Sequence, residues 1–170
     1  MLLTIWRHGE AADAATDFAR RLTRRGEHDV LVGTQAFLQQ CADLDLARPS
    51  ELRFSPWTRT RMTAEIIARA LNENGSCIQS EAAVISPEGN VDKTEQLVAA
   101  IEREPSAPAH LLLVSHQPLV SRLIGFYLGD AGIVPPLNPG GYAILSLDPA
   151  AQGCGRINCW ALPPQYEGSR

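Results

Sequence analysis

The sequence predicts a single-domain α/β protein, a three-layer α/β/α sandwich with a mixed, mostly parallel sheet. The first observation behind this prediction is that strand-like and helix-like apolar patterns alternate along the chain, which is typical of layered α/β folds. The second is length, because 170 residues, 45% of them hydrophobic, suffice for one domain with a sizeable core. Residues 1–170 contain no internal repeat and no linker that would divide them, so one domain is expected.

The first half of the chain alternates two strand patterns with two helical ones. The predicted elements are strands at 2–6 and 51–54, a polar loop at 10–25, and helices at about 27–41 and 56–71. Ser55 and Pro56 are typical of a helix start, as N-cap and first-turn proline. Asn74-Gly75 is typical of a helix end, so the second helix is expected to close there.

The second half continues the alternation and ends in a hairpin. The predicted elements are a strand at 77–84, a helix at 92–104, a strand at 110–114, a helix at 118–128, strands near 142–147 and 156–161, and a loose tail at 162–170. The strand at 110–114 is wholly apolar after its first residue, so it is expected to lie buried within the sheet.

Composition limits the classes of partner. The formal net charge is −4, and the isoelectric point of about 5.5 leaves no overall positive field to attract nucleic acid or an anionic membrane surface. We therefore expect neither nucleic acid nor a membrane as a partner. The oligomeric state is not determined by the sequence, although no exposed apolar stripe stands out, which favours a monomer.

Cysteine usage and the amino terminus point to one compartment. Cys41, Cys77, Cys154 and Cys159 form no CxxC pair and no zinc-ligand spacing. The amino terminus enters a strand at once, without a charged segment or a long apolar run of the kind that directs export. Reduced thiols and a cytoplasmic location are expected.

A reactive triplet follows the first predicted strand. Strand formers at 2–6 lead directly into Arg7, His8 and Gly9, so a cation and an imidazole lie at the edge of the sheet where α/β proteins bind ligands. Glycine there allows a sharp turn and a close approach of the backbone to a ligand. Taken alone, the triplet is equally compatible with an ordinary turn that carries a histidine by chance.

His116 repeats this arrangement at a second strand. The apolar run that ends at Val114 is followed by Ser115, His116 and Gln117, and a helix is expected to begin at Pro118. A single histidine in such a place would more often cap or pack. Two histidines that each follow an apolar strand favour a shared site.

Arg59 is the third candidate, and helix geometry singles it out. When the 56–71 helix is projected at 100° per residue, Arg59 falls near the centre of the apolar face, whereas Arg61 lies about 200° away and faces solvent. A buried cation needs an anionic partner. That partner is either a bound anion or an internal carboxylate such as Glu10, and the two nearby histidines favour the bound anion.

Together these residues resemble the histidine phosphatases of the phosphoglycerate mutase-like superfamily, and among them the short SixA-like protein-histidine phosphatases. The resemblance covers residues 2 to 120, about 70% of the chain, and rests on four motifs in the family's order: Arg7-His8-Gly9, Arg20-Arg21-Leu22-Thr23 with Gly26, Ser55-Pro56 with Arg59 and Thr63, and Ser115-His116-Gln117-Pro118-Leu119-Val120. Each motif alone is weak, but their joint occurrence is specific.

The resemblance implies a role for each matching residue. His8 would be the nucleophile, and the phosphate pocket would be formed by Arg7, Arg59 and His116, with Arg20 completing it from the loop. Arg21 matches less well than Arg20, because the family's spacing places one residue between the arginine and the following leucine. The substrate-binding residues would further include Gly9, Ser115 and Gln117. No metal and no other cofactor is implied.

The expected chemistry suits these residue types. Arginine forks bind the oxygens of a dianionic phosphoryl group, and positioning with charge stabilisation dominates phosphoryl transfer. Neutral imidazole at His8 would attack phosphorus and form a phosphohistidine that water hydrolyses. His116, as imidazolium, is expected to stabilise charge on the transferring group.

The chain departs from the family pattern at one position. Many members carry a glutamate that protonates the leaving group, and here Val84 stands in its place. Glu81 and Glu88 are close in sequence, but both are expected to be solvated surface acids. An enzyme without a proton donor should prefer leaving groups that need little protonation, such as the P–N bond of phosphohistidine.

The sequence therefore predicts a metal-independent phosphatase that acts through a phosphohistidine intermediate on phosphohistidine in proteins. The alternative within enzymes is a small-molecule phosphomonoesterase with the same site. The alternative from another class is a non-catalytic module that binds phosphate or phosphoproteins. Its partner would accordingly be a phosphorylated protein or a small phosphorylated substrate.

Overall fold

The structure, a computed structural model, describes residues 1–73 and 75–169. Its elements are β1 (Leu2–Arg7), η1 (Asp17–Ala19), α1 (Arg24–Asp43), β2 (Glu51–Phe54), α2 (Thr58–Asn72), β3 (Ile78–Glu81), η2 (Ala83–Ile85), α3 (Val91–Glu102), β4 (His110–Ser115), α4 (Leu119–Leu128), β5 (Tyr142–Leu147) and β6 (Gly155–Ala161). Within the described residues, no helix is both long and apolar enough to cross a membrane.

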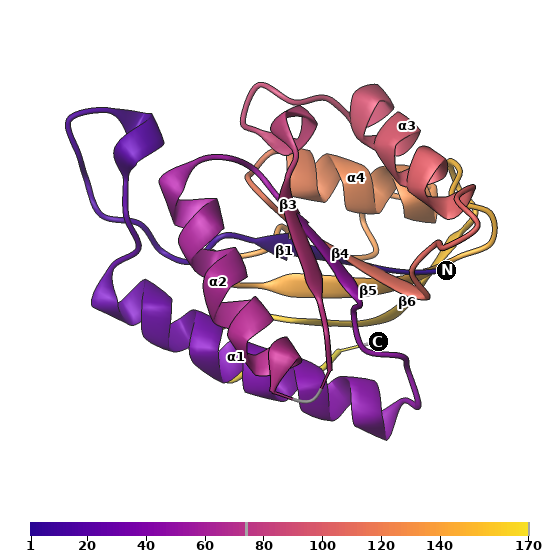
Figure 1. Cartoon of the computed structure of the whole chain (residues 1–170), viewed down its shortest axis with the longest axis horizontal. Coiled ribbons are helices and arrows are strands. Elements are labelled where there is room, and N and C mark those ends of the chain that lie inside the picture. The colour runs from indigo at the N-terminus through magenta and orange to yellow at the C-terminus, as the bar shows by residue number, and fades with distance from the viewer. Residues whose placement is uncertain (74, 170) are drawn as a thin grey trace.

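A single six-stranded sheet forms the centre of the molecule (Figure 1). Its strand order is β3-β2-β4-β1-β5-β6. The pairings among β1 to β4 are parallel, whereas β5 runs antiparallel to β1 and β6 antiparallel to β5. The predicted mixed, mostly parallel sheet is thereby confirmed.

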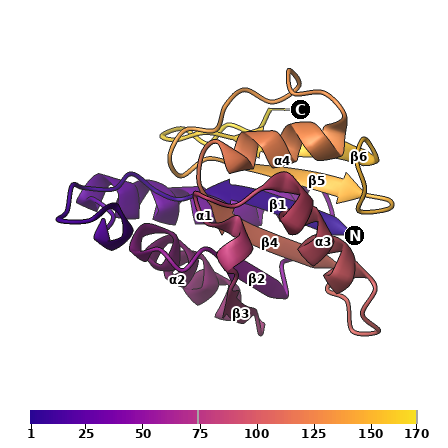
Figure 2. The ribbon, with the colours of Figure 1, turned by 90° about the horizontal axis from the view of Figure 1, so that it is seen from above.

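Helices cover both faces of the sheet, which confirms the three layers (Figure 2). Side chains of a strand alternate between faces, and β1 shows the division. Leu3 and Ile5 pack in the cluster that contains α3 and α4, and Trp6 packs in the cluster of α1 and α2. The apolar β4 serves both clusters and is buried at every position, as expected for a central strand.

The start of α2 differs from the prediction. The helix begins at Thr58 with Trp57 as its N-cap, and Ser55 does not cap it. The side chain of Ser55 points instead toward His116, and its carbonyl accepts a hydrogen bond from Thr60. The predicted stop at Asn74 lies outside the described residues. The local Ser-Pro pattern therefore predicted the wrong helix start, because the Ser55 side chain contacts His116 instead of capping the helix.

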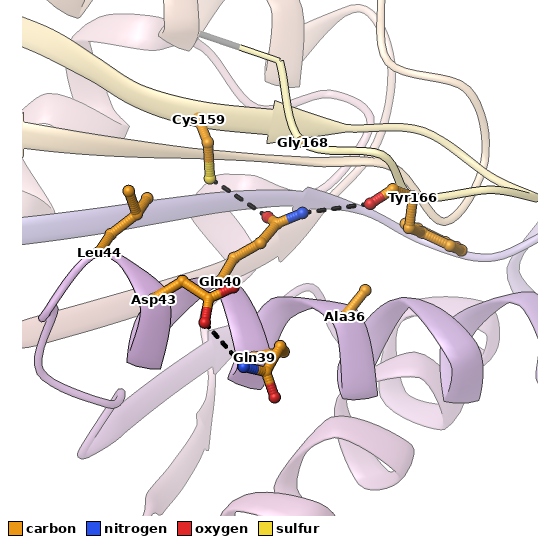
Figure 3. A pocket seen from close by; sticks show the side chains of 8 residues that line it. All are labelled: Ala36, Gln39, Gln40, Asp43, Leu44, Cys159, Tyr166 and Gly168. Carbon is orange, nitrogen blue, oxygen red and sulfur yellow. Dashed lines mark hydrogen bonds between the residues drawn. The ribbon is translucent and has the colours of Figure 1, made fainter.

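The carboxy-terminal segment is packed, so the expectation of a loose tail at 162–170 is wrong for its described part. Tyr166 is only 3% exposed, and its hydroxyl donates to the carbonyl of Gly140. A Cβ added at Gly33 of α1 would lie 2.5 Å from the Tyr166 ring, so the ring rests directly on the helix. Gln40 donates to the Tyr166 carbonyl, as Figure 3 shows, and Ser169 pairs with Trp160 of β6. An aromatic anchor at the chain end holds this segment in place.

A buried histidine lies at the other end of the sheet from the motifs. The His110 side chain is fully buried, with Nδ1 against the carbonyl of Ala47 at 2.6 Å and Nε2 against the Thr4 hydroxyl at 2.7 Å. Burial is the main cause that lowers the pKa of His110 to about 4. The neutral ring satisfies both contacts, since one nitrogen donates and the other accepts.

This burial predicts a loss of stability in mild acid. The unfolded chain, with a histidine pKa near 6.5, binds more protons than the folded protein between about pH 6.5 and pH 4, so stability decreases as the pH falls through that window. His110 alone should account for about 2 kcal/mol between pH 7 and pH 5. Urea unfolding of the wild type and of His110→Asn at both pH values measures this. Equal losses in the two proteins would contradict the assignment.

Candidate active site

Three strand ends build the site. β1 ends at Arg7, β2 at Phe54 and β4 at Ser115, and because these strands are parallel and in register, their carboxyl ends meet at one edge of the sheet. A pocket of about 390 Å³ lies there, lined by Arg7, His8, Glu10, Ala11, Asp17, Arg20, Arg59, Pro87, His116, Gln117 and Pro139. The predicted nucleophile and the four residues predicted to bind phosphate all line this pocket: His8, Arg7, Arg20, Arg59 and His116.

His8 presents an unprotonated Nε2. Arg59 Nε can only donate, and it lies 3.1 Å from His8 Nε2, so that nitrogen accepts. The proton of the neutral ring is then on Nδ1, which lies 2.8 Å from the carbonyl of Gly9 and donates to it. The tautomer follows from these two contacts, and it leaves the lone pair of Nε2 in the pocket.

The surroundings of His8 keep its ring neutral. Burial lowers its pKa to about 4, and the positive charges of Arg59, Arg7 and Arg20 act in the same direction. The hydrogen bond to Gly9 raises the pKa of His8, but this effect is smaller than the combined effects that lower it. An imidazole with a pKa of about 4 is deprotonated, and hence nucleophilic, at neutral pH.

Arg59 lies as the helix projection predicts. Its side chain is 6% exposed, in the first turn of α2, whereas Arg61 is half exposed and forms an ion pair with Glu81 on β3. The guanidinium of Arg59 also lies over the Trp57 ring, 4.6 Å from the centroid. Burial lowers the pKa of Arg59, against the opposing effect of a nearby carboxylate.

That carboxylate belongs to Asp17 and not to Glu10. Asp17 accepts from Arg59 twice, through its carbonyl at 2.7 Å from Nη1 and through Oδ2 at 3.3 Å from Nη2. Glu10 lines the same pocket, but its carboxylate accepts from the Thr23 hydroxyl at 2.8 Å. The internal partner of the buried cation therefore comes from the polar loop.

His116 adjoins His8 and is held by a serine. The two ring centroids lie 5.0 Å apart, and His116 Nε2 is 2.8 Å from the hydroxyl of Ser55. Burial, followed by the effects of His8 and Arg59, lowers the pKa of His116 to about 2. The imidazolium expected at His116 is therefore not the form of the ring in this structure, because a further positive charge would lie unsolvated among cations, and its role with a bound phosphoryl group stays a prediction.

The other two arginines enter from different segments. Arg7 Nη1 donates to the carbonyl of Leu137 at 2.8 Å, which ties the end of β1 to the loop before β5. Arg20 donates to the carbonyls of Ala11 and Ala12 and to Asp17, so it both braces the loop and reaches the pocket. Arg21 does not line this pocket, which supports Arg20 over Arg21.

Of the remaining predicted binding residues, only Gln117 lines the pocket. The amide of Gly9 donates to the Thr63 hydroxyl, and a Cβ at Gly9 would lie 2.8 Å from Val30, so this glycine serves the close contact of β1 with α1. Ser115 is fully buried and donates to the carbonyl of Ile85. Neither is among the residues that line the pocket.

The sought proton donor does not come from the segment around Val84. Val84 packs against the hydrophobic cluster beneath α3 and α4, so a glutamate placed there would enter an apolar region. Glu81 pairs with Arg61, and Glu88 is exposed, and neither lines the pocket. Only Pro87 of this segment reaches it.

Sequence reasoning missed Asp17, which lines the pocket, and gave Ser55 a different role from the one it has, which is to hold His116. Ser55 had a signal that pointed elsewhere, since Ser-Pro suggested a helix cap. Asp17 had none, because it lies in an aperiodic polar loop 42 residues before its partner Arg59.

Within residues 1–73 and 75–169, no group of three or more histidine, cysteine, aspartate or glutamate side chains is placed to hold a metal ion. The pocket instead gathers guanidinium groups, and cations of this kind bind anions.

Known structures share this fold, although no protein-family model and no curated protein sequence matches the chain. A structure of the protein histidine phosphatase SixA complexed with tungstate is 27% identical with a TM-score of 0.79, covering 96% of this chain and 97% of that one. A putative phosphohistidine phosphatase SixA from Agrobacterium tumefaciens is 20% identical with a TM-score of 0.76, covering 96% and 98%.

The similarity extends more weakly to other phosphatases. A mycobacterial glucosyl-3-phosphoglycerate phosphatase structure is 13% identical, with a TM-score of 0.67 and coverage of 95% of this chain and 99% of that one. These findings confirm the resemblance stated above from the four motifs. The chain has the phosphoglycerate mutase-like fold of the histidine phosphatases, and its structure is similar to those of SixA phosphatases.

Proposed function

We propose that this chain is a phosphatase that acts through a phosphohistidine intermediate, independently of metal ions, and that its substrates are phosphohistidines in proteins. One observation carries the proposal. The neutral His8 ring presents the lone pair of Nε2 in a pocket that also contains the guanidinium groups of Arg7, Arg20 and Arg59. A nucleophile among fixed cations is what the attack on a dianionic phosphoryl group requires.

The proposed reaction has two steps. His8 Nε2 attacks phosphorus, a P–N bond forms, and the bond from phosphorus to the leaving group breaks, with the electron pair going to the leaving group. Water then attacks the phosphohistidine, the P–N bond to His8 breaks, and inorganic phosphate leaves. The hydrogen bond from Nδ1 to Gly9 holds the ring orientation through both steps.

The cations account for binding and charge stabilisation. Arg7, Arg20 and Arg59 all line the pocket, so three guanidinium groups are available to oppose the charge of the phosphoryl oxygens. His116 is neutral in this structure, but a bound dianion would counter the field of the arginines and raise its pKa. Its contribution therefore depends on the substrate's own charge.

Two features support phosphohistidine as the substrate. No carboxylate of the segment between β3 and α3 lines the pocket, so the leaving group receives no proton from there, and a P–N bond needs less such help than an alkyl ester. The described residues between α2 and β4, 73 and 75–109, form only β3, η2 and α3, so they contain no separate domain that would cover the pocket against a protein substrate.

The first prediction concerns the nucleophile. His8→Ala should abolish turnover of p-nitrophenyl phosphate while the fold, monitored by circular dichroism, stays intact, because the substitution removes only the attacking nitrogen. Acid-labile, base-stable radiolabel from a phosphorylated substrate should be trapped on the wild type and not on the variant. Activity of His8→Ala within about tenfold of wild type would show that His8 is not the nucleophile. A wild type that binds phosphate but never releases nitrophenolate would instead support a binding module.

The second prediction concerns Arg59, with Arg61 of the same helix as the matched control. Arg59→Ala should weaken the binding of inorganic phosphate by about 1.5–3 kcal/mol, the usual range for a charged hydrogen-bond partner. Arg61→Ala should leave it nearly unchanged, since Arg61 pairs with Glu81 outside the pocket. Isothermal titration calorimetry measures both, and equal effects would mean that Arg59 is no phosphate ligand.

The third prediction concerns the leaving group. The value of kcat/KM should rise steeply from alkyl to aryl phosphates, with phosphoramidates and phosphohistidine among the better substrates, because no carboxylate of the segment around Val84 replaces the missing acid. Glu81→Gln and Glu88→Gln should keep the same slope. A flat wild-type profile that becomes steep in Glu10→Gln, the variant of a pocket carboxylate, would identify a hidden acid and favour the small-molecule phosphomonoesterase.

A further inference from the structure

The carboxylate of Asp17 bridges two of the pocket's arginines. Oδ1 accepts from Arg20 Nη1 at 3.1 Å, and Oδ2 accepts from Arg59 Nη2 at 3.3 Å, while the Asp17 carbonyl accepts from Arg59 Nη1 at 2.7 Å. The two carboxylate oxygens are thus each held by a different guanidinium. Arginines hold two oxygens of a phosphoryl group in the same way. A phosphoryl group that binds Arg59 and Arg20 through the same N–H groups displaces the carboxylate from them.

The two sides of this contact differ in how firmly they are held. The Arg59 side chain is 6% exposed and packed in α2, whereas the Asp17 side chain is 54% exposed. Asp17 lies in the short η1 helix. This helix and the residues before it, from 12 to 19, are all exposed, and the segment lies at the edge of the molecule in Figure 1. Beyond the arginines, Phe18 holds the segment against the Trp57 ring, with centroids 5.7 Å apart. Asp17 can therefore leave Arg59 without disturbing either apolar cluster.

Charge makes Asp17 an effective competitor. The hydrogen bond from Arg20 and the charge of Arg59 hold the pKa of Asp17 below its usual range, so it is ionised at neutral pH. The other charged and titratable groups of the pocket are Arg7, His8, Glu10 and His116. A buried guanidinium without an anion is costly, so the carboxylate stabilises Arg59 in place.

We propose that Asp17 is an internal competitor for the phosphate site: its carboxylate holds Arg59 and Arg20, the substrate's phosphoryl group displaces it, and it returns as the product phosphate leaves. The exchange makes and breaks hydrogen bonds only. The proposal rests on the proposed function in one respect, which is that these two arginines bind phosphate. Every anion that binds there bears the same cost of displacement, so Asp17 lowers the apparent affinity for all of them by one common factor.

The test measures anion binding, so it can be read without turnover. Inorganic phosphate is titrated by calorimetry into wild type, Asp17→Asn, Asp17→Ala and the control Asp13→Asn, and vanadate is measured as a competitive inhibitor. The Asp13→Asn substitution removes the same charge from the same loop. Asp13 lies 4.0 Å from Arg20, but it is fully exposed and does not contact Arg59. Both asparagine variants keep the size of the side chain.

Removal of the competitor should tighten binding. Both Asp17 variants should bind phosphate at least about tenfold more tightly than wild type, which is the lower end for a lost charged hydrogen bond. Vanadate should gain by the same factor, KM for p-nitrophenyl phosphate should fall, and Asp13→Asn should change each constant less than about twofold. Phosphate should also become a stronger product inhibitor of the Asp17 variants.

Three outcomes would overturn the proposal. Phosphate binding that is unchanged or weaker in both Asp17 variants would show that Asp17 aligns Arg59 for the anion. A lower kcat on alkyl phosphates with an unchanged phosphate affinity would make Asp17 a proton donor. Absence of phosphate binding in every protein would remove the site itself. The first two outcomes leave the proposed function standing, since trapping of phosphate on His8 tests that function separately.

Discussion

The hydrogen bond from Arg59 Nε to His8 Nε2 links burial, tautomer and charge across the whole site. A guanidinium cannot accept, so the contact requires a bare Nε2, and the bare Nε2 requires the proton on Nδ1, where Gly9 receives it. A protonated His8 would point an N–H at a buried cation. Burial is the main cause of the low pKa of His8, and the charge of Arg59 acts in the same direction, so the contact with Arg59 orients the ring and helps to keep it neutral.

The sheet supplies the precision that this arrangement requires. Arg7 pairs with Ser115 in the parallel register of β1 with β4, and Phe54 of β2 pairs with Val114, so the residues that follow each strand begin at the same level. His8 and His116 are thereby brought to a centroid separation of 5.0 Å from positions 108 residues apart in the chain. A slip of one residue in either pairing would turn the side chains to the opposite face.

Those features of the site that depend on local pattern were predictable, and those that depend on distant contacts were not. Apolar runs ending in histidine located His8 and His116, and the 3.6-residue period located Arg59 on the buried face. Asp17 was not predictable as the partner of Arg59, because its loop has no periodicity that would orient a side chain.

The same distinction applies to the carboxy-terminal segment and to the protonation state of His116. The described part of the carboxy-terminal segment is packed because Tyr166 stacks on the Tyr142 ring and rests on Gly33. The residues next to Tyr166 in the sequence give no pattern that predicts these contacts. The neutral state of His116 in this structure was not predictable either, because the resemblance gives its position but not its burial, and burial among cations is what lowers its pKa to about 2.

The contacts of Arg59 also constrain the order of events in catalysis. In the proposed reaction, the lone pair that attacks phosphorus is the one that accepts from Arg59 Nε, so a nucleophile held in this way is not yet free to react. A phosphoryl group that draws the guanidinium toward its own oxygens weakens that hydrogen bond and releases Nε2. Binding and activation of the nucleophile then occur together, because one guanidinium serves both.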